Sequence, residues 1–285
     1  MAVGPLFYVY PHSSTGTGSA LFALWAHGEG GVMQAPYGLE VVEDCLSCKL
    51  RSEGFFCHLP KPMMEAFQPL KFTLAYPAGA TLFTEGQVCR GIYILCKGRV
   101  KLSATSSEGR TLIFKIAQPG EALGLNAAVS GMPHDSTADT GQPCQVDFVN
   151  RDDFLKFLSE HGDACMHAAR HLSRECQQAY QQLRSFVMAS APQRIARLML
   201  DWSHDDCLMV TAQGIKVALT HDEIGQIIGM SRETVTRTLA NFRRQHIAKL
   251  RGSRLLIQNM HAIQRRAGAS IDDPTGRNGH VFAPG

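Results

Sequence analysis

The stretch Leu219–Arg244, LTHDEIGQIIGMSRETVTRTLANFRR, predicts two short helices joined by a tight turn. Thr220 and Glu223 have the spacing of a capping box, so the first helix should begin directly after Thr220. Ser231 is a good N-cap for the second helix, whose apolar residues recur at helical spacing. Two glycines lie where a close helix crossing and a turn with positive φ would require them: Gly225 and Gly229. The pattern is typical of a helix-turn-helix.

The outward face of the second predicted helix carries side chains suited to reading base pairs: Arg232, Glu233, Thr236 and Arg237. A helix-turn-helix presents the first turns of this helix to the major groove. Arg can donate to guanine O6 and N7, and Glu can accept from cytosine N4. The alternative is an ordinary helix pair with a solvated charged face, but the caps, glycines and charges together favour DNA recognition. The two cap residues, Ser231 and Thr220, are further candidate DNA contacts.

The composition of the 285-residue chain, 45% hydrophobic and 19% charged, indicates a globular protein long enough for two domains. Its net charge is only +3, so affinity for nucleic acid must come from local clustering. One such cluster lies within residues 232–254: Arg232, Arg237, Arg243, Arg244, Lys249, Arg251 and Arg254. No apolar run is long enough to span a membrane and no secretory signal is recognisable, so we expect a cytoplasmic protein.

The pattern changes along the chain and predicts an α+β protein with six segments. Short apolar runs broken by glycines indicate a β-roll, and an apolar stripe at three- and four-residue spacing indicates a long helix. We interpret that stripe as a dimer-forming coiled coil; the alternative is a helix packed on its own domain. The segments are a disordered arm (1–36, with Met33 as a hypothetical true start), a cysteine segment (37–66), the β-roll (67–158), the dimerisation helix (159–188), a winged helix-turn-helix (189–260) and a flexible tail (261–285).

Two stretches carry a family resemblance. Residues 223–239, EIGQIIGMSRETVTRTL, resemble the recognition motif of the Crp/Fnr superfamily of bacterial transcription regulators. Residues 78–102, AGATLFTEGQVCRGIYILCKGRVKL, resemble the jelly roll of cyclic-nucleotide-binding domains, as carried by the same superfamily. The resemblance implies an N-terminal β-roll, a long dimerisation helix and a C-terminal winged helix-turn-helix. It also implies a homodimer that binds double-stranded DNA, contacts RNA polymerase and has no enzymatic activity.

The segment that would hold a cyclic nucleotide departs from the pattern of the family's nucleotide binders. Gly120 and Glu121 agree with it, but residues 134–137 read His-Asp-Ser-Thr where the nucleotide binders place an Arg for the phosphate. Because an Asp at this point would repel a phosphate, cyclic AMP is not expected as the effector.

Nine cysteines in a chain without an export signal favour thiol, metal or redox chemistry over a disulfide framework. Cys45, Cys48 and Cys57 supply three sulfur ligands with the spacing C-x2-C-x8-C, and a metal or cluster site usually needs four. The segment CQVDFVNRDDFL resembles the oxygen-sensing fumarate-nitrate regulator branch, where a cysteine at this point completes a [4Fe-4S] cluster. The resemblance therefore implies Cys144 as the fourth ligand; the alternatives are Cys89 and Cys96.

The sequence leaves other ways of controlling DNA binding open: zinc, thiol oxidation, haem or a different small molecule. A thiol oxidoreductase using Cys45 and Cys48 is the alternative from a different class, but the βαβ context of such motifs is lacking. No Ser-His-Asp arrangement, phosphate loop or pair of catalytic carboxylates stands out, so no enzymatic activity is expected.

The recognition helix suggests which DNA is read. Arg232 precedes Glu233, as in the nucleotide-activated branch and unlike the oxygen-sensing branch. We therefore expect a palindrome of TGTGA-like half-sites, preferred over TTGAT. The target genes, the choice between activation and repression, and the choice between oxygen and nitric oxide as the signal are left open.

Overall fold

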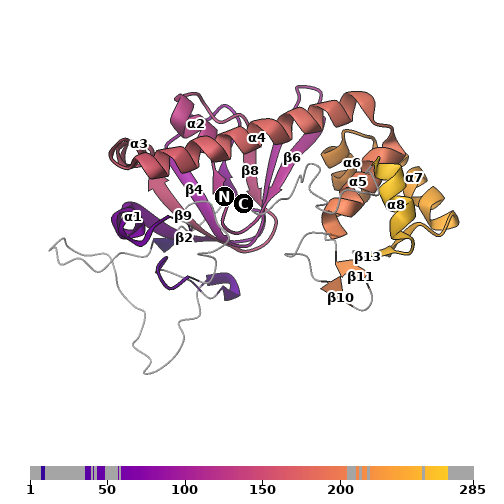
Figure 1. Cartoon of the computed structure of the whole chain (residues 1–285), viewed down its shortest axis with the longest axis horizontal. Coiled ribbons are helices and arrows are strands. Elements are labelled where there is room, and N and C mark those ends of the chain that lie inside the picture. The colour runs from indigo at the N-terminus through magenta and orange to yellow at the C-terminus, as the bar shows by residue number, and fades with distance from the viewer. Residues whose placement is uncertain are drawn as a thin grey trace, which may run out of the picture. The chain divides into compact units, whose positions relative to one another are not determined.

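The computed structural model describes residues 8–9, 36–39, 41, 44–48, 57, 59–203, 210–211, 214–216, 219–251 and 254–268 (Figure 1). The chain divides into two compact units. The first comprises residues 1–100, 119–134 and 139–168, and the second comprises residues 101–118, 135–138 and 169–285. None of the helices within the described ranges is long and apolar enough to cross a membrane.

The first unit is organised around an antiparallel five-stranded sheet in the order β1-β2-β9-β4-β7. Its strands are β1 (Tyr8–Val9), β2 (Lys71–Tyr76), β4 (Gly91–Lys97), β7 (Ala122–Leu123) and β9 (Cys144–Asn150). A separate four-stranded sheet, most of whose residues fall in the second unit, has the order β3-β8-β5-β6. Its strands are β3 (Thr81–Phe83), β5 (Val100–Thr105), β6 (Thr111–Ala117) and β8 (Thr137–Thr140). The predicted jelly-roll architecture is confirmed.

Three short helices complete the first unit: α1 (Lys61–Phe67), α2 (Leu125–Ser130) and α3 (Arg151–Glu160). Phe67 of α1 meets Phe157 of α3 edge to face, with ring centroids 5.2 Å apart. The side chain of Asn150 caps α3 by accepting a hydrogen bond from the Asp152 amide. Neither α1 nor α2 was predicted, because six or seven residues give too little periodicity to recognise.

Helix α4 (Gly162–Met188) agrees with the predicted long helix. The C-terminal part of its apolar stripe is exposed in the single chain. The exposed large side chains of α4 are Met166, Tyr180, Leu183, Val187 and Met188. Ala168, nearer the start of the helix, is buried within the single chain.

The remaining helices of the second unit are α5 (Ala191–Ser203), α6 (His221–Ile228), α7 (Arg232–Arg244) and α8 (Met260–Ala267). A small sheet has the order β10-β11-β13-β12, with β10 (Val210–Thr211), β11 (Gly214–Lys216), β12 (Ala248–Arg251) and β13 (Arg254–Ile257). The apolar faces of the helices form one core that includes Ile195, Trp202, Ile227, Val235, Leu239 and Phe242. Figure 1 shows α6 and α7 beside α5 and α8, the predicted winged helix-turn-helix.

Two predicted segments need correction. The flexible tail was placed too early, because residues 260–267 form α8 and bury Ile263 and Ala267; residues 269–285 lie outside the described residues. In the predicted disordered arm, Tyr8 and Val9 pair with Ala75 and Leu74 of β2. The other residues up to 35, with the hypothetical start at Met33, lie outside the described residues.

Candidate nucleic-acid interface and metal centre

The helix-turn-helix is built as its sequence predicts. Thr220 and Glu223 form a complete capping box at the start of α6, and the Ser231 side chain caps α7 by accepting from the Thr234 amide. Gly229 ends α6 with a φ of 66°. A Cβ on Gly225 would lie 2.5 Å from the Met230 carbonyl oxygen, so only glycine allows this close approach of the turn.

The predicted reading face of α7 is exposed. Arg232, Glu233, Thr236 and Arg237 all lie on the outer surface, whereas Val235 on the opposite side is fully buried. The backbone amide of Glu233 and then the Ser231 hydroxyl hold the pKa of the Glu233 carboxyl below its ordinary value, so it is an ionised acceptor at neutral pH. Thr220 and Ser231 are exposed at the two helix starts, although their hydroxyls are already used as caps.

One contact on this face was not predicted. The Thr236 hydroxyl donates to the Arg232 carbonyl at 2.9 Å and lies 2.9 Å from His221 Nδ1. His221 is the first residue of α6, so this contact joins the two helices of the motif. It orients Thr236 relative to α6. The sequence signal was weak, because His221 and Thr236 lie 15 positions apart and share no periodic pattern.

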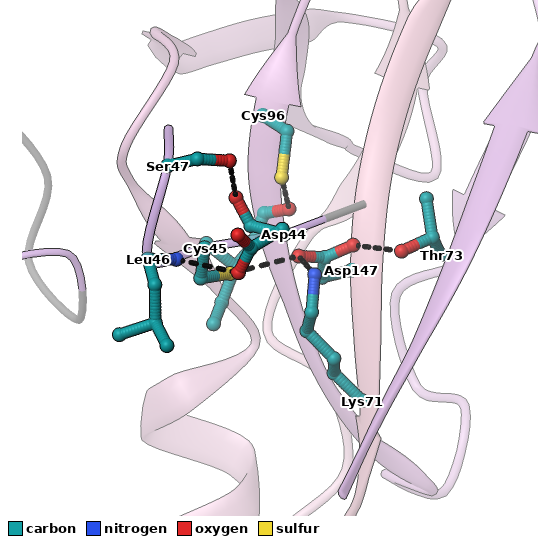
Figure 2. Close-up of polar contacts among 9 residues, drawn as sticks. Asp44, Cys45, Leu46, Ser47, Lys71, Thr73, Cys96 and Asp147 are labelled. Atoms are coloured by element: carbon teal, nitrogen blue, oxygen red, sulfur yellow. Dashed lines mark hydrogen bonds and ion pairs between the residues drawn. The ribbon is translucent and has the colours of Figure 1, made fainter. Parts of the chain in front are cut away.

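The first two predicted metal ligands lie in a turn organised by Asp44. Its carboxylate accepts from the Leu46 amide at 2.9 Å, and the Ser47 hydroxyl donates to the Asp44 carbonyl at 3.3 Å (Figure 2). The Leu46 amide is also the main reason that the pKa of Asp44 is lowered. This turn directs the Cys45 thiol towards the Asp147 carboxylate, 3.8 Å away on β9.

A buried ion pair lies beneath this turn. Lys71 Nζ is 2.7 Å from Asp147 Oδ2, and their side chains are 0% and 2% exposed. The Thr73 hydroxyl donates to Asp147 Oδ1 at 2.7 Å. Register places the three together, because Thr73 pairs directly with Asp147 and Lys71 lies two positions before Thr73 on the same face of β2. Figure 2 shows Lys71 and Thr73 reaching Asp147 from the neighbouring strand.

Four thiols lie close enough to interact electrostatically, and we call them the thiol cluster: Cys45, Cys48, Cys57 and Cys96. Burial raises the pKa of Cys45 to about 11 and that of Cys57 to about 12, and each thiolate would also be repelled by the thiolate of Cys48. Burial raises the pKa of Cys96 well above its ordinary value, with further repulsion from Asp147, Cys45 and Cys57. Lys71 attracts all three of these thiolates.

The thiol cluster has the donor chemistry of a thiolate-bound metal or iron–sulfur centre, with the Lys71 cation to offset negative charge. The thiols would have to give up their protons to bind a metal, because at neutral pH burial keeps Cys45, Cys57 and Cys96 protonated. Within the described residues, no three Cys, His, Asp or Glu side chains are already arranged to hold a metal ion.

The other two candidate fourth ligands lie elsewhere. The buried Cys144 thiol donates to the carbonyls of Gln142 and Arg99, at 3.1 and 3.4 Å, and burial raises its pKa to about 11. The buried Cys89 thiol donates to the Gly91 carbonyl at 3.4 Å. The structure therefore brings together Cys45, Cys48 and Cys57 of the predicted set, but not Cys144. On α4, Cys165 and Cys176 are exposed.

The segment compared with a nucleotide site has its own local order. His134 is buried and stacks on Phe83, with ring centroids 3.9 Å apart and planes 12° from parallel. Asp135, which stands in the region where nucleotide binders place an Arg, is exposed and accepts a hydrogen bond from the Ser136 hydroxyl at 3.1 Å. An exposed carboxylate here offers no attraction to a phosphate.

Comparison with known proteins agrees with both units. Residues 73–161 match the family model for the cyclic nucleotide-binding domain, and residues 193–266 match that for the Crp-like helix-turn-helix domain.

Curated relatives include the CRP-like cAMP-activated global transcriptional regulator of Mycobacterium tuberculosis. It is 27% identical over 209 residues, which cover 72% of this chain and 90% of the relative. The cAMP-activated global transcriptional regulator CRP of Pasteurella multocida is 25% identical over 197 residues, covering 69% of this chain and 94% of the relative.

Solved structures show the same fold. The c-di-GMP responsive global regulator CLP of Xanthomonas campestris aligns with a TM-score of 0.63 and 19% identity, covering 70% of this chain and 99% of that one. FixK2 of Bradyrhizobium japonicum aligns with a TM-score of 0.62 and 21% identity, covering 70% and 98%. Both family models and these relatives are regulatory rather than catalytic, which excludes the thiol oxidoreductase alternative. The chain is a DNA-binding transcription regulator of the Crp/Fnr superfamily.

Proposed function

We propose that this regulator acts as a cytoplasmic homodimer whose DNA binding is gated by an oxygen- or nitric-oxide-labile [4Fe-4S] cluster on Cys45, Cys48 and Cys57. The observation that carries the proposal is the convergence of these thiols around the buried Lys71–Asp147 pair. When bound, the cluster supplies an oxidant-sensitive bond between the N-terminal cysteine segment and the sheet. The chain's own contribution is the Asp44 turn, which aims Cys45 at β9, and the Lys71 ammonium, which offsets thiolate charge.

The proposed DNA contacts are Arg232, Glu233, Thr236 and Arg237, with Ser231 and Thr220 nearby. All six are exposed, and Arg243 and Arg244 in the last turn of α7 extend the positive surface. Arg232 should add a guanine contact, worth about 1–3 kcal/mol of discrimination. We therefore propose TGTGA-like half-sites, one helical turn apart because two copies of the motif read one palindrome.

Homodimerisation is supported by the apolar stripe of α4. Tyr180, Leu183, Val187 and Met188 are between 58% and 75% exposed in the single chain. Such a continuous apolar row at helical spacing is stable in water when a second copy covers it. Contact with RNA polymerase is proposed from family membership alone.

Arg194 connects helix α4 with the helix-turn-helix, and this connection offers a route by which α4 can influence DNA binding. Its guanidinium donates to the carbonyl of Phe186 in the last turn of α4 and to that of Ala189 just after the helix. It also donates to the Ile228 carbonyl at the end of α6, 2.8 Å away. It also lies over the Phe186 ring, 5.4 Å from the centroid. A displacement of α4 should therefore be transmitted through Arg194 to the turn of the helix-turn-helix. Moving a two-state switch from 1:99 to 99:1 needs about 5.5 kcal/mol of differential binding.

Anaerobic reconstitution of the full chain tests the gate. Equal amounts of ferrous and ferric iron with sulfide should give a brown protein with broad visible absorbance, and exposure to air should bleach it and weaken DNA binding. A colourless protein with stoichiometric zinc would contradict the cluster. Cyclic AMP should leave DNA binding unchanged, because residues 134–137 read His-Asp-Ser-Thr where the nucleotide binders place an Arg for the phosphate.

A gel-shift at two salt concentrations tests the DNA site preference that we assign to the exposed face of α7. Wild type should prefer a TGTGA palindrome to a TTGAT palindrome, and Arg232→Val should erode that preference while leaving the Arg237 contact in place. If the variant keeps the site preference of wild type, the assignment of this face is wrong.

A further inference from the structure

Strand geometry separates Cys144 from the thiol cluster. Cys144 and Asp147 lie three positions apart on β9, and alternate residues of a strand point to opposite faces of the sheet. Asp147 faces Lys71, Thr73 and the cysteine turn, so Cys144 points to the other face. There it packs against Gly98, where any Cβ would collide with its sulfur. Cys144 therefore fills a tight interior position.

Cys96 lies on the face that Cys144 does not reach. On β4, Ile94 pairs with Asp147, and Cys96 is two positions further along. The pairing of β4 with β9 shifts between Leu95 and Lys97, which leaves Cys96 at a β-bulge. Bulges re-aim a side chain and bend the strand. Figure 2 shows the Cys96 sulfur directed towards the space that Cys45 and Asp147 share.

Asp147 and Cys96, which both interact with the N-terminal cysteines, differ in how firmly their side chains are held. The Asp147 carboxylate is engaged by Lys71 and Thr73, each at 2.7 Å. The Cys96 thiol makes a long 3.7 Å contact with the Ile94 carbonyl. Binding through Asp147 would break a buried ion pair, which is costly. Binding through Cys96 would give up only a weak S–H···O contact, and its thiolate would interact with Cys45 and Cys57.

We propose that Cys96 is the fourth sulfur ligand of the centre held by Cys45, Cys48 and Cys57, and that Cys144 is a packing residue. The inference rests on the proposed function. On binding iron, Cys96 releases its proton to solvent and donates a sulfur lone pair, with no change in oxidation state. The Lys71–Asp147 pair stays intact beside it. The bulge on β4 is the feature that delivers this ligand.

A matched pair of variants, Cys96→Ala and Cys144→Ala, tests the proposal in the full chain. Each is reconstituted anaerobically with equal amounts of ferrous and ferric iron and with sulfide, and iron, acid-labile sulfide and visible absorbance are measured per chain. Cys96→Ala should lose most of its iron, since even outer-shell changes cost roughly 10–100-fold in metal affinity. Cys144→Ala should load like wild type. Circular dichroism of the metal-free proteins checks that both variants are folded.

Two further variants keep the test decisive. If Cys96→Ala does not fold, Cys96→Ser preserves the volume, and its harder oxygen ligand should give a cluster that bleaches faster in air than wild type. Asp147→Asn removes the carboxylate ligand and keeps the Lys71 cation that offsets thiolate charge, so this variant should still load iron.

The outcomes separate this proposal from the proposed function. A wild type that takes up neither iron nor sulfide overturns cluster gating itself. A wild type that loads, together with a Cys96→Ala variant that loads equally well, overturns only the ligand assignment. Loss of iron in Cys144→Ala, or in Asp147→Asn, while Cys96→Ala retains it would identify Cys144 or Asp147 as the ligand instead.

Discussion

The buried Lys71–Asp147 pair makes a strong prediction about the stability of the metal-free protein. The two charges are 2.7 Å apart, and their side chains are almost fully buried. Replacing Lys71 by Met leaves the Asp147 carboxylate with the Thr73 hydroxyl and the Cys45 thiol as partners. Removing one member of a buried pair costs about 3–5 kcal/mol, because the remaining charge stays in a low-dielectric interior. Lys71→Met should therefore lower the free energy of unfolding by that amount.

Replacing both members should be much less damaging. In Lys71→Met/Asp147→Leu no charge remains to be desolvated, and such apolar replacements are often neutral or stabilising by about 1–4 kcal/mol. The Thr73 hydroxyl loses its acceptor, at a cost of about 1–3 kcal/mol. The double variant should therefore lie within roughly 2 kcal/mol of wild type, far from the sum of the two single variants.

Hydrogen exchange at the amides of β2 and β9 measures the free energy of unfolding of each metal-free variant around the buried pair. The control is Lys61→Met in α1, which removes an exposed pair with Glu65 whose side chains are 69% and 54% exposed. This change should alter stability by no more than about 0.5 kcal/mol. The reasoning fails if Lys71→Met behaves like the control, or if the double variant is destabilised by the sum of both single changes.

Three other predictions concern the second unit. Burial raises the pKa of Asp201 from 3.8 to about 7, so between these values the native chain binds more protons than the unfolded chain and stability falls as pH rises; the melting temperature of Asp201→Asn should therefore gain on wild type between pH 4 and 7 and keep that lead above pH 7. Thr220→Ala removes the capping box of α6 and should cost about 1 kcal/mol, with a matching loss of DNA affinity in gel-shifts; unchanged melting would contradict it. Leu183→Glu should convert the dimer to monomers in sedimentation experiments, whereas Arg184→Glu, which changes charge at a neighbouring exposed position, should leave it dimeric.

The sequence predicted the helix-turn-helix well because the signals that define this motif are local. The capping box, the turn glycine and the N-cap of α7 each act over three or four residues, and the structure confirms all of them. The long helix was also predicted close to its observed bounds, and the β-roll was predicted as an architecture. Helices α1, α2 and α8 were missed, since each has no more than eight residues and owes its position to packing.

The fourth ligand could not be predicted in this way, because a resemblance gives a position along a strand but not the face on which a side chain lies. A partial signal was present. Lys71 and Thr73 alternate with the apolar Phe72 and Leu74, which puts polar side chains on one face of β2, and Asp147 interrupts an apolar strand. Those polar residues were not recognised as one buried group, since they are 74 and 76 positions apart from Asp147 in sequence.

The sequence by itself determined the helix-turn-helix, the exposed Arg-Glu-x-x-Thr-Arg face and the three clustered cysteines at the N-terminal side of the sheet. Each depends on residue type and short-range spacing. The tertiary structure alone decided that Cys96 joins these thiols beside the buried Lys71–Asp147 pair. Cys144 lies on the other face of the sheet, away from that pair. The physical reason is the alternation of side chains along a strand, together with one bulge, which sends cysteines of neighbouring strands to opposite faces of the same sheet.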